Sequence, residues 1–111
     1  MDILEAKSTE ALTLALKGRL DASSSGSLEE KVLKHIEGGE RRIIIDFAQL
    51  DYISSVGLRV LMLASKRLKP VGGRLVLCAL QPGVRQVFDI AGFSTILAIV
   101  DTRDQAVAKL V

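Results

Sequence analysis

Several residue types are scarce in this chain of 111 residues, and each scarcity excludes something. Trp is absent and aromatic residues make up 4%, whereas hydrophobic residues make up 49%. The core must therefore be built from aliphatic side chains. A single cysteine, Cys78, excludes a disulfide framework within the chain, and its position in an apolar run predicts a buried, unreactive thiol. No apolar run approaches the length of a membrane span.

The chain also lacks a large excess of positive or negative charge. The 15 basic and 13 acidic residues leave a formal net charge of +2 and are spread along the chain. Such a balance does not favour binding to nucleic acid or to anionic lipid. The first five residues carry acidic side chains where a secretory leader would carry basic ones. We therefore expect a cytoplasmic protein that neither inserts into membranes nor binds nucleic acid.

The apolar residues that are present follow an alternating order of strands and helices. Residues 11–17 alternate with a period of two, and residues 3–6 can form a partner strand, whereas the later apolar runs are typical of strands buried on both faces. The expected strands are 3–6, 11–17, 43–45, 75–80 and 96–100, and the expected helices are 27–37, 55–69, 82–91 and 102–110. This order predicts one α/β domain over residues 1–111, with a mixed, mostly parallel sheet and about four helices.

Local motifs predict several element boundaries. Ser27 and Glu30 match a capping box, which places the start of the first helix at Ser27. Asp46 is expected to end the third strand, so that residues 47–53 form a loop. Asp101 or Thr102 is expected to cap the last helix.

The most informative feature is the pair Ser54-Ser55, placed where that loop leads into the second helix. The first N–H groups of a helix lack partners within the helix, and the helix dipole presents partial positive charge there. A serine at this place can cap the helix, or it can carry a phosphate whose charge the helix end tolerates. The two hydroxyl groups leave both interpretations open.

The second helix carries two apolar series. Leu58, Leu61 and Leu68 form a stripe that is expected to face the sheet. A second series, Val56, Val60 and Leu63, lies around the helix from the first. Because a helix packed on one sheet needs only one stripe, we expect the second series to be an exposed docking patch.

The residues do not favour an enzyme. A nucleophile elbow around Ser55 would need glycine at position 53, which is Ile53, and the only histidine, His35, lies on the first helix. Asp46 lacks the additional carboxylates of a magnesium site, so a loop-capping role is favoured over a phosphoacceptor role. Neither a phosphate-binding glycine loop nor a zinc-binding spacing is present.

An ordered set of motifs resembles the STAS domain, which sulphate transporters share with anti-sigma factor antagonists. The motifs are Gly18-Arg19-Leu20-Asp21, Ile43-Ile44-Ile45-Asp46, Tyr52-Ile53-Ser54-Ser55-Val56-Gly57-Leu58, Gly72-Gly73-Arg74-Leu75 and Val87-Phe88-Asp89-Ile90-Ala91-Gly92-Phe93. With nothing flanking these motifs, the chain resembles a free-standing anti-sigma factor antagonist rather than the tail of a transporter.

The resemblance implies a phosphorylation switch. In that family an anti-sigma factor that is also an ATP-dependent serine kinase phosphorylates the position that aligns with Ser55. The unphosphorylated protein binds this kinase and frees the sigma factor, and a serine phosphatase restores binding. The antagonist itself needs no cofactor, because ATP belongs to the kinase, and a monomer or weak dimer is expected.

The expected partner surface combines the resemblance with the apolar series of the second helix. It comprises Asp21, Ser23, Ser54, Ser55, Val56, Gly57, Leu58, Val60 and Leu63. This chain departs from the family where it has Ser54 in place of an aspartate and Val56 in place of a serine or threonine, which makes Ser54 a competing acceptor. The alternative is a STAS accessory subunit of a membrane lipid-transport complex, bound through the same surface without phosphorylation, or a member of another partner-switching assembly.

Overall fold

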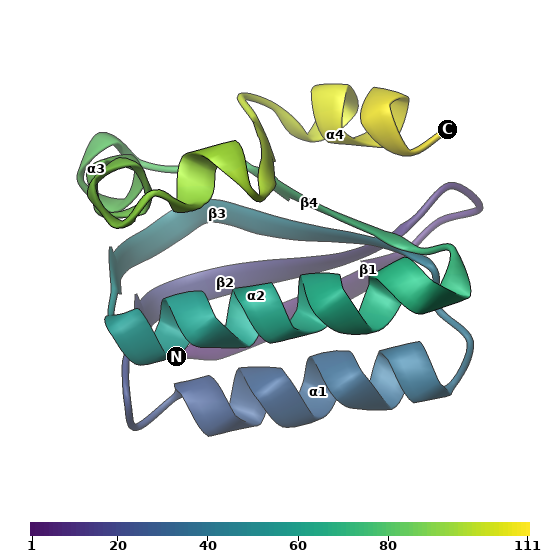
Figure 1. The fold of residues 1–111 in the computed structure, drawn as a ribbon, viewed down its shortest axis with the longest axis horizontal. Helices are drawn as coiled ribbons and strands as arrows, with labels where there is room; N and C mark the ends of the chain where they lie inside the picture. The colour runs from purple at the N-terminus through teal and green to yellow at the C-terminus, as the bar shows by residue number, and fades with distance from the viewer.

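A computed structural model describes residues 1–111, and it has the expected alternation of strands and helices (Figure 1). The elements are β1 (Asp2–Lys7), β2 (Leu12–Leu20), α1 (Ser25–Glu37), β3 (Arg42–Ile53), α2 (Ser55–Leu68), β4 (Arg74–Cys78), α3 (Pro82–Ala91), β5 (Ala98–Val100) and α4 (Arg103–Leu110). Short 3₁₀ turns, η1 (Lys69–Val71) and η2 (Phe93–Thr95), follow α2 and α3. None of the helices is both long and apolar enough to cross a membrane.

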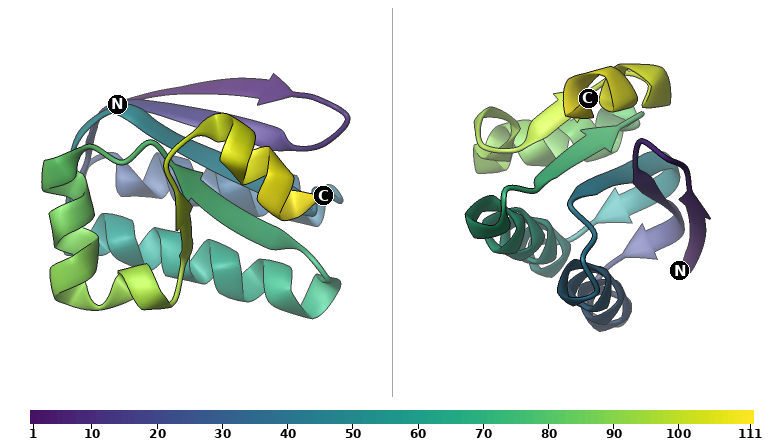
Figure 2. Two further views of the ribbon diagram at one scale, coloured as in Figure 1. Left: turned by 90° about the horizontal axis from the view of Figure 1, so that it is seen from above. Right: turned by 90° about the vertical axis from the view of Figure 1, so that its right-hand side faces the viewer.

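The five strands form one sheet in the order β1-β2-β3-β4-β5. β1 pairs with β2 in antiparallel fashion, and all other neighbours are parallel. Helices α1 and α2 lie side by side along one face of this sheet, and α4 lies on the opposite face (Figures 1 and 2). The predicted α/β class and the edge position of the N-terminal strand are therefore confirmed.

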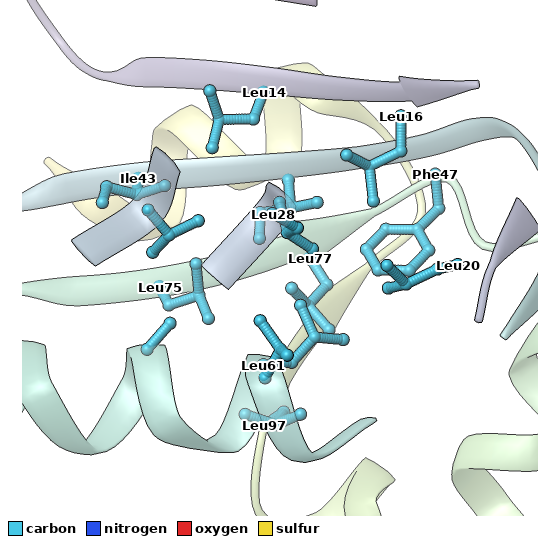
Figure 3. Close-up of a cluster of buried hydrophobic side chains, with 14 of the residues drawn as sticks. Leu14, Leu16, Leu20, Leu28, Ile43, Phe47, Leu61, Leu75, Leu77 and Leu97 are labelled. Carbon is cyan, nitrogen blue, oxygen red and sulfur yellow. The ribbon is translucent and has the colours of Figure 1, made fainter. Parts of the chain in front are cut away.

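Aliphatic side chains fill two core clusters, one on each face of the sheet. The larger cluster lies between the sheet and helices α1 and α2, where leucines from β2, β4 and both helices point toward one another (Figure 3). The smaller cluster lies beneath α4 and includes Ile44, Val76 and Leu110. Ile43 and Ile45 belong to the larger cluster, so β3 is buried on both faces, as its apolar run predicts.

Strand β3 is longer than expected, and the prediction of a loop at 47–53 is wrong. Beyond Asp46, β3 continues to pair with β2, with Gly18 opposite Leu50 and an irregularity in the register on either side. The side chains that maintain the strand, Phe47, Leu50 and Ile53, are all buried. The same pairing extends β2 to Leu20, beyond the predicted end at residue 17.

Helix α1 begins at Ser25, so the capping box predicted at Ser27 is wrong. The loop before the helix turns at Asp21, whose carbonyl oxygen accepts bonds from Ser25 N at 2.9 Å and Ser25 Oγ at 2.6 Å. These bonds start the helix two residues early. By contrast, Thr102 caps α4 in a capping box with Gln105, as expected.

Candidate functional site at the start of helix α2

Ser54 is the N-cap of α2. Its backbone is extended (φ −96°, ψ 171°), and its Oγ accepts a hydrogen bond from Gly57 N at 3.3 Å. Ser54 N donates to Leu20 O at 2.9 Å, which ties the cap to the end of β2. The hydroxyl of Ser54 is therefore occupied by a structural role.

Ser55 is the first residue of α2, and its side chain is exposed. Its hydroxyl group makes no hydrogen bond to the rest of the chain. The residue follows directly after the cap, where the N–H groups and the helix dipole favour negative charge. Of the two serines, Ser55 is thus the one whose hydroxyl is exposed and has no hydrogen-bond partner in the chain.

Gly57 sets the close approach of α2 to the sheet. A Cβ atom at this position would lie 2.8 Å from Leu20 Cγ and 3.0 Å from Ile53 Cγ1. Both neighbouring side chains are buried. The absence of a side chain therefore lets the first turn of α2 rest on the ends of β2 and β3, which fixes where Ser55 emerges.

The loop after β2 and the start of α2 leave the sheet at the same end, because β2 and β3 are parallel. Within it, Asp21 Oδ1 accepts bonds from Ser23 Oγ at 2.7 Å and Ser23 N at 3.0 Å. The hydroxyl of Ser23 is the main cause that lowers the pKa of the Asp21 carboxyl, which is partly exposed and stays ionised near neutral pH.

Arg19 and Tyr52 are two further residues at this end of the sheet; both lie in the motifs quoted above, but neither was predicted to belong to the partner surface. The Arg19 guanidinium carbon lies 4.2 Å from the centroid of the Tyr52 ring, and Arg19 Nε lies 3.8 Å from Asp21 Oδ2. Arg19 and Tyr52 are paired across β2 and β3. Only this pairing, with its irregular register, brings them together, so their spacing in the sequence carries no signal.

Part of the predicted partner surface is buried, which corrects the expectation of an exposed apolar series. Val60 is 6% exposed and Leu58 is 4% exposed, and both belong to the larger core. Gly57 is buried as well. Helix α1 lies alongside α2, and its buried residues belong to the same core cluster as Leu58 and Val60. Val56 remains 37% exposed, and Leu63 is half-buried.

Comparison with known proteins assigns the chain to a family. The family model of the STAS domain matches residues 3–106. The chain belongs to the STAS domain family. The resemblance in its motifs is thereby confirmed.

Several relatives of this STAS domain are named anti-sigma factor antagonists. The chain is 43% identical over 97 residues to BtrV of Bordetella bronchiseptica, provisionally named an anti-sigma factor antagonist, covering 87% of this chain and 84% of BtrV. It is 26% identical over 100 residues to the anti-sigma F factor antagonist of Paenibacillus polymyxa, covering 89% and 86% of the two chains. The solved structure of the antagonist SpoIIAA in its unphosphorylated form has the same fold, with a TM-score of 0.83 at 24% identity, covering 97% and 95%.

Other side chains of this STAS domain that could carry chemistry are either bonded within the chain or buried. Asp46 Oδ1 accepts a bond from Ala48 N at 2.9 Å. His35 Nε2 lies 2.7 Å from Glu5 Oε1, and this contact is the main cause that lowers the pKa of Glu5. Cys78 is fully buried, and burial is the first cause that raises the pKa of its thiol to about 11. The prediction of a buried cysteine is confirmed.

Proposed function

We propose that this STAS domain is an anti-sigma factor antagonist, a binding protein rather than an enzyme, and that phosphorylation of Ser55 ends its binding. The observation that carries the proposal is the exposed, unbonded hydroxyl of Ser55 directly beside the hydroxyl of Ser54, which caps the helix. The names of its relatives support the antagonist role. The partner is an anti-sigma factor with serine kinase activity, met in the cytoplasm where ATP is available.

The chemistry at Ser55 is a phosphoryl transfer. The Ser55 Oγ forms a bond to the γ-phosphorus of ATP held by the kinase, while the bond from that phosphorus to the β–γ bridging oxygen breaks and ADP leaves. The hydroxyl proton passes to a base of the kinase. A serine phosphatase reverses the state by adding water across the ester, which restores the hydroxyl and releases inorganic phosphate.

The added phosphate changes the surface more than the fold. It brings about −1.5 to −2 charges at neutral pH, against a formal net charge of +2 for the chain. At the first turn of α2 this charge meets the favourable end of the helix dipole. A partner that covers the same spot instead meets new repulsion and the cost of desolvating an anion.

The docking surface in this proposal is smaller than the sequence alone suggests. It comprises the loop after β2, with the partly exposed Asp21 and the exposed Ser23, together with Ser55, Val56 and the exposed part of Leu63. Val56 supplies apolar contact area next to the reactive hydroxyl. The buried residues Leu58 and Val60 support this surface from below.

Incubation with candidate anti-sigma kinases and ATP, followed by mass-spectrometric mapping, tests the proposal. We expect one phosphate on Ser55, no incorporation in Ser55→Ala, and continued incorporation in Ser54→Ala. Binding to the kinase should be lost when Ser55 is phosphorylated. Tight binding to a partner with no phosphate under any condition would overturn the switch and favour an accessory subunit of a lipid-transport complex.

A further inference from the structure

Arg59 lies one helical turn after Ser55 on the outer face of α2. Residues four apart in a helix are separated by about 6 Å along the axis and by about 40° around it. Their side chains are therefore neighbours on one face. Ser55 and Arg59 are both exposed, whereas Leu58 and Val60 on either side of Arg59 are buried.

The guanidinium of Arg59 has no partner in the unmodified protein. It takes part in none of the ion pairs of the chain, and no hydrogen bond engages it. Helix α2 itself contains no acidic residue that could neutralise it. By comparison, Lys31 pairs with Glu5, and Arg85 pairs with Asp89 one turn along α3.

We propose that Arg59 is part of the switch, because it forms an ion pair with a phosphate on Ser55 along the outer face of α2. This inference rests on the proposed function, since it needs the phosphate at Ser55. Modification then changes two side chains at once. A free cation beside the docking surface becomes one half of a pair whose net charge is negative, so a carboxylate of the partner that met Arg59 loses its attraction.

No other cation of α2 is equally placed. Lys66 and Arg67 lie eleven and twelve residues after Ser55, which is about 16–18 Å along the helix and beyond the reach of a phosphate. Arg19 is engaged with the Tyr52 ring and with Asp21. A planar guanidinium also matches the geometry of phosphate oxygens with two parallel hydrogen bonds.

The test uses the full chain with phosphoserine incorporated at position 55 during synthesis, so that no kinase is needed. Phosphorus NMR then follows the second ionisation of the phosphate as pH changes. A nearby cation favours the doubly charged form, so Arg59→Gln should raise the pKa of the phosphate by a few tenths of a pH unit. Arg59→Lys should restore part of the difference.

Arg67→Gln is the matched control, because it removes an exposed arginine from the same helix three turns away. It should leave the ionisation of the phosphate unchanged. The effect of Arg59 should also shrink in 1 M salt, where exposed charges are screened. Identical titration curves for the parent and Arg59→Gln would overturn the inference.

Failure of this inference and failure of the proposed function give different results. If no anti-sigma kinase labels Ser55, the proposed function fails, while the titration of the synthetic phosphoprotein still reports the pair with Arg59. If Ser55 is labelled and binding is lost, but the titration is insensitive to Arg59, the switch stands and the role of Arg59 is wrong.

Discussion

Replacing Gly57 with alanine measures how closely α2 must approach the sheet to present Ser55. The new Cβ would lie 2.8 Å from Leu20 Cγ and 3.0 Å from Ile53 Cγ1. These side chains are 0% and 2% exposed, so neither can move aside without disturbing the core. The helix must therefore shift away from β2 and β3, or the core must repack.

Two opposing effects determine how much Gly57→Ala changes the free energy of unfolding. Alanine in place of glycine within a helix contributes about 0.5–1 kcal/mol through the backbone. Overpacking a well-filled core costs about 1–3 kcal/mol. Because the clash at Gly57 is with two buried side chains, the second effect should win, leaving a net loss of about 1 kcal/mol in the free energy of unfolding. For a domain of this size, that loss lowers Tm by about 5 °C.

Urea unfolding followed by circular dichroism measures this loss, and Gly83→Ala is its control. Gly83 is also in the first turn of a helix, and a Cβ there would meet nothing within 4 Å. Its substitution should stabilise the protein by up to about 1 kcal/mol. If both variants were stabilised equally, close packing at Gly57 would not be what positions α2, and the reasoning would be refuted.

Three further predictions concern the same region and the core. Ser54→Ala should lower the free energy of unfolding by about 1 kcal/mol through loss of the cap, whereas Ser55→Ala should change it by less than about 0.5 kcal/mol; equal losses in urea would contradict the assigned roles. Val60→Glu buries a carboxylate and should abolish the cooperative thermal transition, while Val56→Glu should melt like the parent and bind its partner less tightly; a folded Val60→Glu would disprove the burial. The thiol of Cys78, with its pKa raised to about 11, should react with a disulfide reagent at pH 8 only as fast as the protein unfolds, and rapid labelling of native protein would count against this.

The fold could be predicted because its main signals are local. Strands buried on both faces appear as continuous apolar runs, as at Ile43–Ile45, and each is followed by a helix with recognisable ends. Gly92 ends α3 with a φ of +78°, and Thr102 caps α4. Both residues act within a few positions of themselves, so their roles need no knowledge of the tertiary structure.

The features that the sequence analysis did not predict depend on contacts between segments that are distant in the chain. The core residues of the second half of β3, Phe47, Leu50 and Ile53, are three apart rather than two, because the pairing with β2 is irregular there. Val60 is buried in a core cluster that it shares with residues of α1, which lies alongside α2. The sequence pattern of an apolar series on a helix is the same whether solvent or a second helix covers that series.

The two serines show why a motif can locate a site without assigning its parts. The N-cap needs an extended backbone and an oxygen directed at an N–H of the first turn, and only one residue at each helix start can meet both conditions. Here the bond from Ser54 N to Leu20 O and the packing of Gly57 on Leu20 fix that residue as Ser54. A shift of α2 by one residue would remove the glycine from the contact that tolerates no Cβ. The register of α2 against β2 therefore leaves the hydroxyl of Ser55 free, and it places Arg59 one turn further along the same exposed face.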